Sequence, residues 1–152
     1  MSALARLKEL GVELPPMVPP VAAYLPAVRT GNLVYTSGQL PMTAAGMAQT
    51  GLVGGPVTPE QAKDLARTCA LNALAAVDAL VGLDSVVRVV KVVGFVACAA
   101  GFTGQPAVIN GASELLGEVF GEAGRHARSA VGVSALPLDA AVEVELIVEV
   151  TP

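Results

Sequence analysis

The stretch Val142-Glu143-Val144-Glu145-Leu146-Ile147-Val148-Glu149-Val150 decides the kind of fold that this sequence can form. Valine or leucine occupies every second position, and the positions between them carry three glutamates and one isoleucine. A period of two is typical of a β-strand that packs one face on a core and turns the other face away from it. Such a strand needs strand partners, and the rest of the chain supplies them.

Further strands are predicted upstream of this one. Residues 85–98 form a valine-rich run with only two charged side chains, which predicts a strand buried on both faces for most of its length. Residues 127–133 predict a shorter strand. Nearer the N-terminus, residues 24–28 and 33–37 favour a hairpin with its turn at residues 29–32.

Two helices are predicted between these strands. Thr58 can cap the first helix, Pro59 suits its first turn, and Gln61 completes a capping box. Gly82 fits its end. One face of this helix carries small residues that let it approach a sheet closely, namely Ala62, Ala66, Cys69, Ala73 and Ala76. The second helix is predicted over residues 106–120, with an apolar inner face.

The N-terminal part of the sequence differs in composition from the rest. Residues 1–20 are interpreted as an arm, followed by a single α+β domain over residues 21–152. Leucines at three-residue spacing predict a short amphipathic helix over residues 2–10, and two proline pairs then favour an extended segment. Residues 41–57 are rich in glycine, threonine and alanine, which predicts mostly loop.

The order of these elements determines the fold class. Helices placed between strands need crossover connections, which run right-handed and put both helices on one face of the sheet. The fold class is therefore α+β, with a mixed sheet and two helices packed on one face. The other face stays bare, and because the chain has 53% hydrophobic and only 14% charged residues, we expect this face to pack on further copies of the chain.

Composition and charge exclude several classes of protein. No apolar run reaches the roughly 20 residues of a membrane-spanning helix, and the first ten residues lack a signal-peptide core, so we expect a soluble, cytoplasmic protein. A net charge of −4 does not supply the basic stripe that nucleic acids need. Cys69 and Cys98 predict buried thiols without metal-ligand spacing. The single histidine, His126, has no partner visible in the sequence and is interpreted as structural or solvent-facing.

One arginine and two glutamates are the candidates for chemistry. Arg128 enters an apolar strand, where an unpaired guanidinium is costly and where its planar fork suits a carboxylate. Two arrangements remain open. Either Arg128 forms a salt bridge with Glu143 or Glu145, or it holds an anionic substrate while a carboxylate handles a proton or a water molecule. The two glutamates also fit a solvated sheet edge.

Several short segments form an ordered set that extends over nearly the whole chain after the arm. They are Tyr24, the run Gly31-Asn32-Leu33-Val34-Tyr35-Thr36-Ser37-Gly38-Gln39-Leu40-Pro41, Asn110, the run Ala127-Arg128-Ser129-Ala130-Val131, and Leu136-Pro137 followed by Val142-Glu143-Val144-Glu145. With fifteen positions separating Arg128 from Glu143, the set resembles the RidA/YjgF (reactive intermediate deaminase) family.

The resemblance implies a chorismate-mutase-like fold that assembles as a homotrimer with clefts between subunits. It implies that Arg128 binds the substrate carboxylate and that Glu143 positions or activates the attacking water. The other implied substrate-binding positions are Tyr24, Ser37, Gly38, Asn110 and Ala130. The implied reaction is hydrolysis of a short 2-imino acid, or its enamine tautomer, to a 2-oxo acid and ammonia, with no metal or other cofactor. The implied partners are the small substrate and further copies of the chain, without nucleic acid or membrane.

The sequence also departs from the archetypal deaminases. Gly132 stands where they usually have an acidic residue, and residues 41–57 form a longer, more glycine-rich loop. One alternative is therefore a non-catalytic trimeric module that binds small carboxylates through Arg128. Nucleic-acid processing, a third hypothesis, is disfavoured by the net charge of −4 and by the lack of a histidine pair for acid–base catalysis.

Overall fold

The computed structural model describes residues 1–17, 19–20 and 22–152. Its elements, in chain order, are α1 (Ala3–Glu9), β1 (Ala27–Thr30), β2 (Leu33–Thr36), β3 (Met42–Thr43), β4 (Gly46–Met47), α2 (Pro59–Val81), η1 (Leu83–Ser85), β5 (Val86–Ala97), α3 (Gln105–Phe120), η2 (Gly121–Gly124), β6 (Ala127–Val133), η3 (Pro137–Asp139) and β7 (Val142–Val150). Five strands form one mixed sheet in the order β1-β2-β7-β5-β6. In this sheet β5 and β6 pair in parallel, and the other neighbours are antiparallel.

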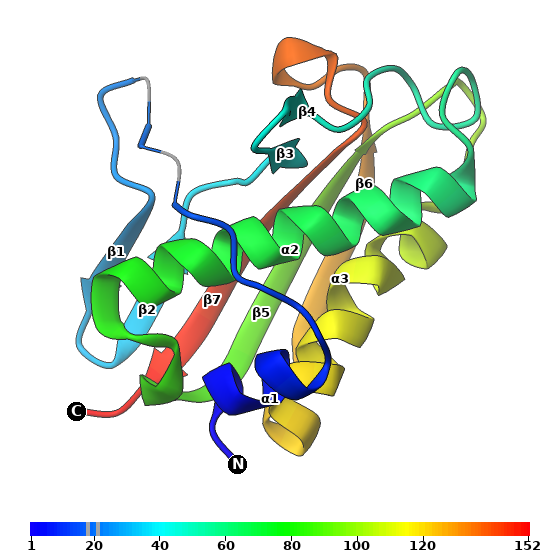
Figure 1. The fold of residues 1–152 in the computed structure, drawn as a ribbon. Coiled ribbons are helices and arrows are strands. Elements are labelled where there is room, and N and C mark those ends of the chain that lie inside the picture. Colours follow the sequence, from blue (N-terminus) through cyan, green and yellow to red (C-terminus); the bar gives the residue numbers. More distant parts are fainter. Residues whose placement is uncertain (18, 21) are drawn as a thin grey trace.

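Helices α2 and α3 lie side by side on one face of this sheet, as predicted (Figure 1). Helix α2 packs on β1, β2 and β7, and α3 packs on β5 and β6. The predicted capping box forms, because the Thr58 side chain accepts from the backbone N–H of Gln61 and the Gln61 side chain accepts from the N–H of Thr58. A Cβ at Gly111 of α3 would overlap the Lys63 carbonyl of α2, so the glycine allows the two helices to touch.

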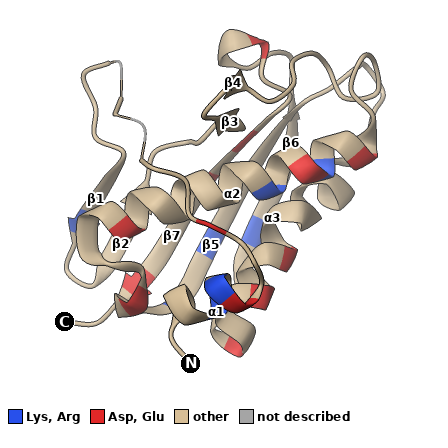
Figure 2. Ribbon diagram, in the orientation of Figure 1, with Lys and Arg blue, Asp and Glu red and all other residues tan. Residues whose placement is uncertain are grey.

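Strand β7 confirms the alternation predicted from its sequence. Its valines and Leu146 are buried beneath the helices, and the four residues between them are half-buried on the other face. This open face also carries Val28, Tyr35 and Val131, with 47%, 40% and 44% of their surfaces exposed. Charged side chains lie on the helices and also on strands of the sheet, the glutamates of β7 among them (Figure 2). The described chain therefore leaves one face of the sheet, which carries both apolar side chains and the three glutamates of β7, without a helix over it.

Strand β5 corrects the prediction of a strand buried on both faces. Val89, Val92 and Val96 are fully buried, whereas Val93 and Phe95 on the open face are only half-buried. The reason is that both helices cover the same side of the sheet. A run of valines suits a strand covered on both sides by helices and also a strand whose second face meets another copy.

The first hairpin is shifted along the chain from its predicted position. Strand β1 is Ala27–Thr30 rather than residues 24–28, so the first half of the predicted turn pairs with β2 instead. The turn consists of Gly31 and Asn32, and Gly31 adopts a φ of 57°, which glycine accepts without a steric penalty. Pro26 has no N–H to donate, so the ladder begins after it.

The N-terminal half contains two smaller elements. Residues 41–57, predicted as mostly loop, include the short ladder of β3 and β4. Helix α1 confirms the helix predicted within residues 2–10, with the Ser2 side chain at its cap and Leu7 buried against the core. None of the helices in the described residues is both long and apolar enough to cross a membrane. The division of the chain at residue 20 and the cytoplasmic location stay predictions.

Candidate functional site

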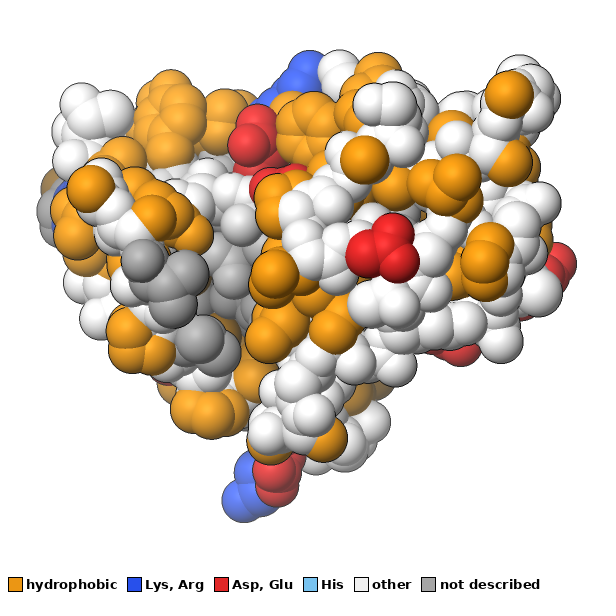
Figure 3. Space-filling view, turned by 90° about the horizontal axis from the view of Figure 1, so that it is seen from above, with side chains coloured by type: hydrophobic (Ala, Val, Ile, Leu, Met, Phe, Trp, Pro, Cys, Tyr) orange, Lys and Arg blue, Asp and Glu red, His pale blue; other side chains and the backbone are white. Residues whose placement is uncertain are grey.

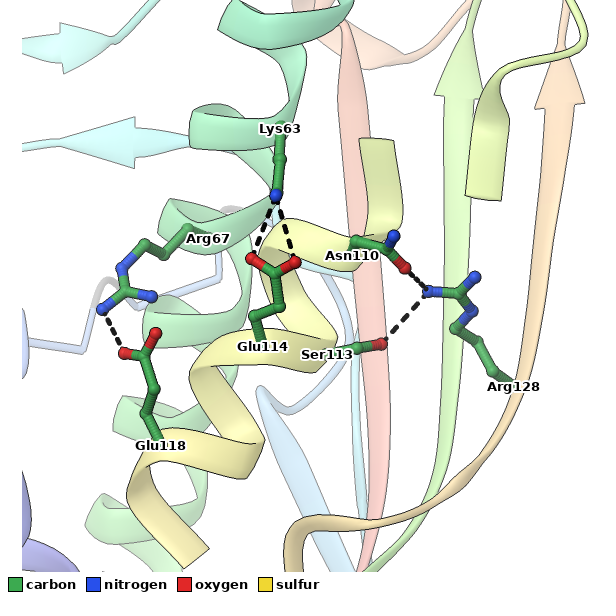
Figure 4. Close-up of polar contacts among 7 residues, drawn as sticks. All are labelled: Lys63, Arg67, Asn110, Ser113, Glu114, Glu118 and Arg128. Atoms are coloured by element: carbon green, nitrogen blue, oxygen red, sulfur yellow. Dashed lines mark hydrogen bonds and ion pairs between the residues drawn. The ribbon is translucent and has the colours of Figure 1, made fainter. Parts of the chain in front are cut away.

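Arg128 lies on β6, at one edge of the sheet. It pairs with Val92, which is buried beneath the helices, so the Arg128 side chain leaves the strand on the helix-covered face. Its Nη1 donates to the side-chain oxygen of Asn110 (2.8 Å) and to Ser113 Oγ (3.3 Å), both on α3 (Figure 4). Residues three apart on a helix share a face. One face of α3 therefore holds the guanidinium beside its strand.

His126 continues this hydrogen-bond chain. Its Nε2 lies 2.9 Å from Ser113 Oγ, and its Nδ1 lies 2.6 Å from the carbonyl oxygen of Gly124. Of the two interpretations of His126, the structural one is confirmed and the solvent-facing one is wrong, because the ring is half-buried and has a partner at each nitrogen. We call Arg128, Asn110, Ser113 and His126 the arginine cluster.

Neither Ser113 nor the contact that His126 makes with it was predicted from the sequence. A signal was present in the spacing of both residues. Ser113 follows Asn110 by three positions on a helix, and His126 precedes Arg128 by two positions at the start of a strand. Each spacing brings two side chains to one face.

The predicted alternative of a salt bridge between Arg128 and Glu143 or Glu145 is wrong. Within the described residues, no carboxylate oxygen lies within 4.0 Å of the Arg128 guanidinium. Two acidic residues of α3 pair with α2 instead, in the ion pairs Lys63–Glu114 (3.0 Å) and Arg67–Glu118 (2.8 Å) (Figure 4). The other two nitrogens of the guanidinium, Nε and Nη2, have no hydrogen-bond partner within the described residues. This edge of the guanidinium has the geometry for a bidentate carboxylate.

Glu143 lies on the open face of β7, opposite Phe95 of β5. Burial, and secondarily repulsion from Glu145, raise the pKa of its carboxyl group above the ordinary value for glutamate. Gly38 packs directly against this carboxylate, and a Cβ at Gly38 would overlap Glu143 Oε1. The position of the carboxylate therefore depends on a glycine at residue 38. We call Glu143 and Gly38 the carboxylate site.

The arginine cluster and the carboxylate site lie on opposite faces of the sheet. Arg128 pairs with Val92, and Glu143 pairs with Phe95, three residues further along β5. Side chains an odd number of residues apart on a strand point to opposite faces. With strands about 4.8 Å apart and a rise of about 3.3 Å per residue, the Cα atoms of Arg128 and Glu143 lie on the order of 14 Å apart. A short imino acid cannot contact both within one copy of the chain.

The remaining predicted residues divide between these two places. Ser37 Oγ donates to the carbonyl oxygen of Leu25 (2.6 Å), which fixes the backbone just before Gly38. Tyr24, which is 52% exposed, and Gly38 line a mostly apolar hollow of about 210 Å³, at the end of the molecule seen in Figure 3. Ala130 lies on the helix-covered face, two residues from the arginine. The structure thus groups Tyr24, Ser37 and Gly38 with Glu143, and Asn110 and Ala130 with Arg128.

The two cysteines lie outside both clusters. Cys69 is buried, as predicted, whereas Cys98 is only half-buried, and both are free thiols. Burial, and secondarily the charge of Glu143, raise the pKa of the Cys69 thiol. Among the described residues, no three side chains of His, Cys, Asp or Glu are placed to hold one metal ion.

The chain is similar to known proteins over most of its length. The model of the family described as endoribonuclease L-PSP matches residues 16–150. Protein TCP17 of Trypanosoma cruzi is 46% identical over 147 residues, which cover 95% of this chain and 92% of that protein. The 2-iminobutanoate/2-iminopropanoate deaminase of Dermatophagoides farinae is 36% identical over 134 residues, which cover 88% of this chain and 91% of that protein.

Solved structures share the fold. The protein Atu1372 from Agrobacterium tumefaciens is 48% identical and has a TM-score of 0.91, covering 98% of this chain and 92% of its own. A protein from Shewanella oneidensis is 30% identical with a TM-score of 0.94, and the match covers 99% of this chain and 100% of that chain. The E. coli YjgF product is 31% identical with a TM-score of 0.62, and the match covers 90% of this chain and 93% of that chain. E. coli TdcF with bound serine is 25% identical with a TM-score of 0.61, and the match covers 91% of this chain and 94% of that chain. The chain belongs to the RidA/YjgF/L-PSP family and has its α+β, chorismate-mutase-like fold.

Proposed function

We propose that this chain catalyses the hydrolysis of short 2-imino acids, or their enamine tautomers, to 2-oxo acids and ammonia. The observation that carries the proposal is the orientation of Arg128. Its Nη1 is held by two side chains of α3, while Nε and Nη2 have no hydrogen-bond partner among the described residues. A guanidinium oriented in this way matches the carboxylate of an imino acid. The similarity to the mite deaminase supports the reaction class.

We further propose that each site forms between two subunits of a homotrimer. Arg128 and Glu143 lie on opposite faces of one sheet, so a substrate held by Arg128 needs the carboxylate of another copy. The exposed apolar side chains on the open face of the sheet, among them Val28, Tyr35 and Val131, provide a surface on which copies can pack. The number of three subunits follows from the family resemblance.

In the complete site, the substrate carboxylate binds Arg128 and its imine carbon lies near Glu143 of the neighbouring copy. Glu143 accepts a proton from a water molecule as the water oxygen bonds to the imine carbon, and this proton passes to the nitrogen. A second transfer, from the new hydroxyl group to the nitrogen, lets the C–N bond break and releases ammonia, leaving the 2-oxo acid. A raised carboxyl pKa favours this role, because a general base works best when its pKa is near the working pH.

The reaction suits a site with few catalytic groups. Imines hydrolyse readily in water, so the enzyme has mainly to orient the substrate and to place one positive and one negative charge beside it. Arg128 and Glu143 supply these two charges. The apolar side chains of the open face exclude bulk water once a second copy covers them.

The experiment generates 2-iminobutanoate and 2-iminopropanoate freshly in solution and measures the release of ammonia and 2-oxo acid above the spontaneous rate. We expect the wild-type chain to accelerate the release and the Arg128→Ala variant to show the spontaneous rate. A wild-type chain that leaves the rate unchanged with both substrates would contradict the proposal.

A second candidate is a non-catalytic module that binds small carboxylates through the same arginine. It is favoured by one observation, the serine bound to the relative TdcF. The two functions differ in the role of Glu143, since a binding module saturates with ligand and releases no product. The endoribonuclease description of the family is not adopted, because a net charge of −4 disfavours binding to a phosphate backbone.

A further inference from the structure

We propose that Ser113 and His126 are positioning residues that hold the Arg128 guanidinium in its carboxylate-binding orientation. The inference rests on the proposed role of Arg128 as the ligand of the substrate carboxylate. It assigns a function to the single histidine of the chain, which touches neither Nε nor Nη2 of the arginine.

The direction of each hydrogen bond follows from the backbone carbonyl at the end of the chain of contacts. The Gly124 oxygen can only accept, so the 2.6 Å contact requires a hydrogen on His126 Nδ1. A neutral ring then has a bare Nε2, which accepts the hydroxyl hydrogen of Ser113 at 2.9 Å. With its hydrogen turned to the ring, Ser113 Oγ presents its lone pairs to Arg128 Nη1 at 3.3 Å. His126 thus makes Ser113 an acceptor for the arginine.

The packing of Gly124 against α3 fixes the end of this hydrogen-bond chain that lies furthest from Arg128. Gly124 is the last residue of η2 and is buried, and a Cβ there would overlap the Leu116 carbonyl of α3. The turn therefore lies directly against α3, the helix that also carries Asn110 and Ser113. His126 connects this turn to the helix, so the two acceptors of Arg128 stay in place relative to β6.

The loss of His126 has a defined consequence. The Ser113 hydrogen then no longer has the histidine nitrogen as its acceptor and can turn toward the guanidinium, where it opposes the N–H of Nη1. Asn110 alone would hold Nη1, through one hydrogen bond. A guanidinium with one anchor rotates more freely and pays more entropy when it binds a carboxylate.

The test compares Ser113→Ala, His126→Asn and the double variant. The measurements are KM and kcat for 2-iminobutanoate and the calorimetric Kd for the product 2-oxobutanoate. Each single variant is expected to raise KM and Kd about fivefold, because a guanidinium with one anchor pays more entropy when it binds a carboxylate, with kcat within about twofold of wild type. The double variant should be no worse than either single variant, because both remove the same contact.

Conservative variants separate positioning from packing. His126→Gln places an amide near the position of Nε2 and Ser113→Thr keeps the hydroxyl group, so both should keep KM within about twofold of wild type. Thr68→Ala is the matched control, since the Thr68 hydroxyl bonds only within α2 in the described structure and its loss should leave KM unchanged. In the wild-type protein, the ¹⁵N spectrum of the only histidine should show the Nδ1–H tautomer when the ring is neutral.

Three results would overturn the proposal: additive effects of the two substitutions, an unchanged Kd in both single variants, or an Nε2–H tautomer in the wild-type ring. The tautomer is read in the wild-type chain, so it decides the matter even where a variant fails to fold. Failure of the proposed function is recognised separately. A wild-type chain that binds 2-oxobutanoate but releases no ammonia contradicts the deaminase, and the positioning role is then read from Kd. A wild-type chain that binds no carboxylate overturns both.

Discussion

The arginine cluster and the carboxylate site differ in how many of their partners the chain itself supplies. In the arginine cluster, Asn110 and Ser113 accept from Arg128, and the chain of hydrogen bonds ends on a backbone carbonyl. In the carboxylate site, Glu143 is half-buried with a raised pKa, and nothing in the described residues donates a hydrogen bond to its carboxylate. One region is organised within a single copy, and the other is not.

The difference indicates what a second copy has to contribute. The arginine cluster holds its guanidinium at an edge strand through two hydrogen bonds, as the proposed binding of a substrate carboxylate requires. The carboxylate lies on the open face of the sheet, where in the proposed trimer another subunit would bury it further and bring it to a substrate. The five predictions that follow act on one region or the other, in order of decreasing effect.

Replacement of the arginine should have the largest effect. Arg128→Ala removes two charge-assisted hydrogen bonds to the substrate carboxylate, so we expect kcat/KM to fall by about 10³-fold. Arg128→Lys keeps the positive charge but not the planar pair of N–H donors, and we expect kcat/KM to fall by about 10²-fold. The exposed Arg125, which pairs with Glu122, provides the control. The Arg125→Ala variant should have the same kcat/KM as the wild type. Retention of a tenth or more of the activity in Arg128→Ala would remove the arginine from the site.

Replacement of the carboxylate should separate catalysis from binding. We expect Glu143→Gln to lower kcat by about 10²-fold through loss of the general base. The Kd for 2-oxobutanoate should stay close to wild type, because Arg128 is intact. Steady-state kinetics and calorimetry on the same preparation measure both. A variant that loses binding and keeps kcat would reverse the roles assigned to the two regions.

The same variant should also change the pH dependence of stability. Because folding raises the Glu143 pKa, the folded chain binds the proton more tightly, and this stabilisation is lost as the pH rises through the folded pKa. Glu143→Gln avoids that loss, so its Tm should exceed that of wild type at pH 7. The difference should disappear below the ordinary glutamate pKa of about 4.3. A lower Tm for the variant at pH 7 would show that the carboxylate is stabilised rather than strained by its surroundings.

Gly38→Ala should disturb the carboxylate without removing it. The new methyl group overlaps the Glu143 carboxylate, so the carboxyl group must move, and we expect kcat to fall about tenfold through misplacement of the base. Gly117→Ala on the exposed side of α3 has open space around its Cβ and is the matched control, with unchanged kcat. Full activity in Gly38→Ala would mean that the observed position of the carboxylate does not matter for turnover.

Glu145→Gln should have the smallest effect, a shift of the pH profile. Glu145 raises the Glu143 pKa by repulsion, so its neutralisation lowers that pKa. The acidic limb of kcat/KM should therefore move toward lower pH, while the maximum rate stays unchanged. Glu149→Gln lies further along the same face of β7 and should leave the limb in place. A shift toward higher pH would contradict the assignment of the limb to Glu143.

Local patterns made much of the fold predictable from the sequence. The alternation of β7 depends on neighbouring residues alone, and the start of α2 depends on Thr58 and Gln61. The placement of both helices on one face followed from right-handed crossovers. The hairpin was misplaced because its ladder depends on pairing with β2, which composition does not specify.

The candidate site was only partly predictable, because it depends on register between strands. The alternation within β7 is visible in the sequence, but which face of the sheet Arg128 of β6 shares with it is set by pairing through β5. A salt bridge between Arg128 and Glu143 therefore looked possible and does not form. The contact of His126 with Ser113 depends on how η2 packs against α3, which no local pattern records.

Mixing two inactive variants tests most directly whether the site forms between copies. Arg128→Ala keeps Glu143, and Glu143→Gln keeps Arg128, so a mixed assembly can join an intact arginine to an intact carboxylate across an interface. After equal amounts are unfolded and refolded together, about one site in four should be complete in a closed ring with one kind of interface. Imine hydrolysis should then recover to about a quarter of the wild-type rate. A mixture no more active than its separate components, despite confirmed mixed oligomers, would contradict a site shared between subunits.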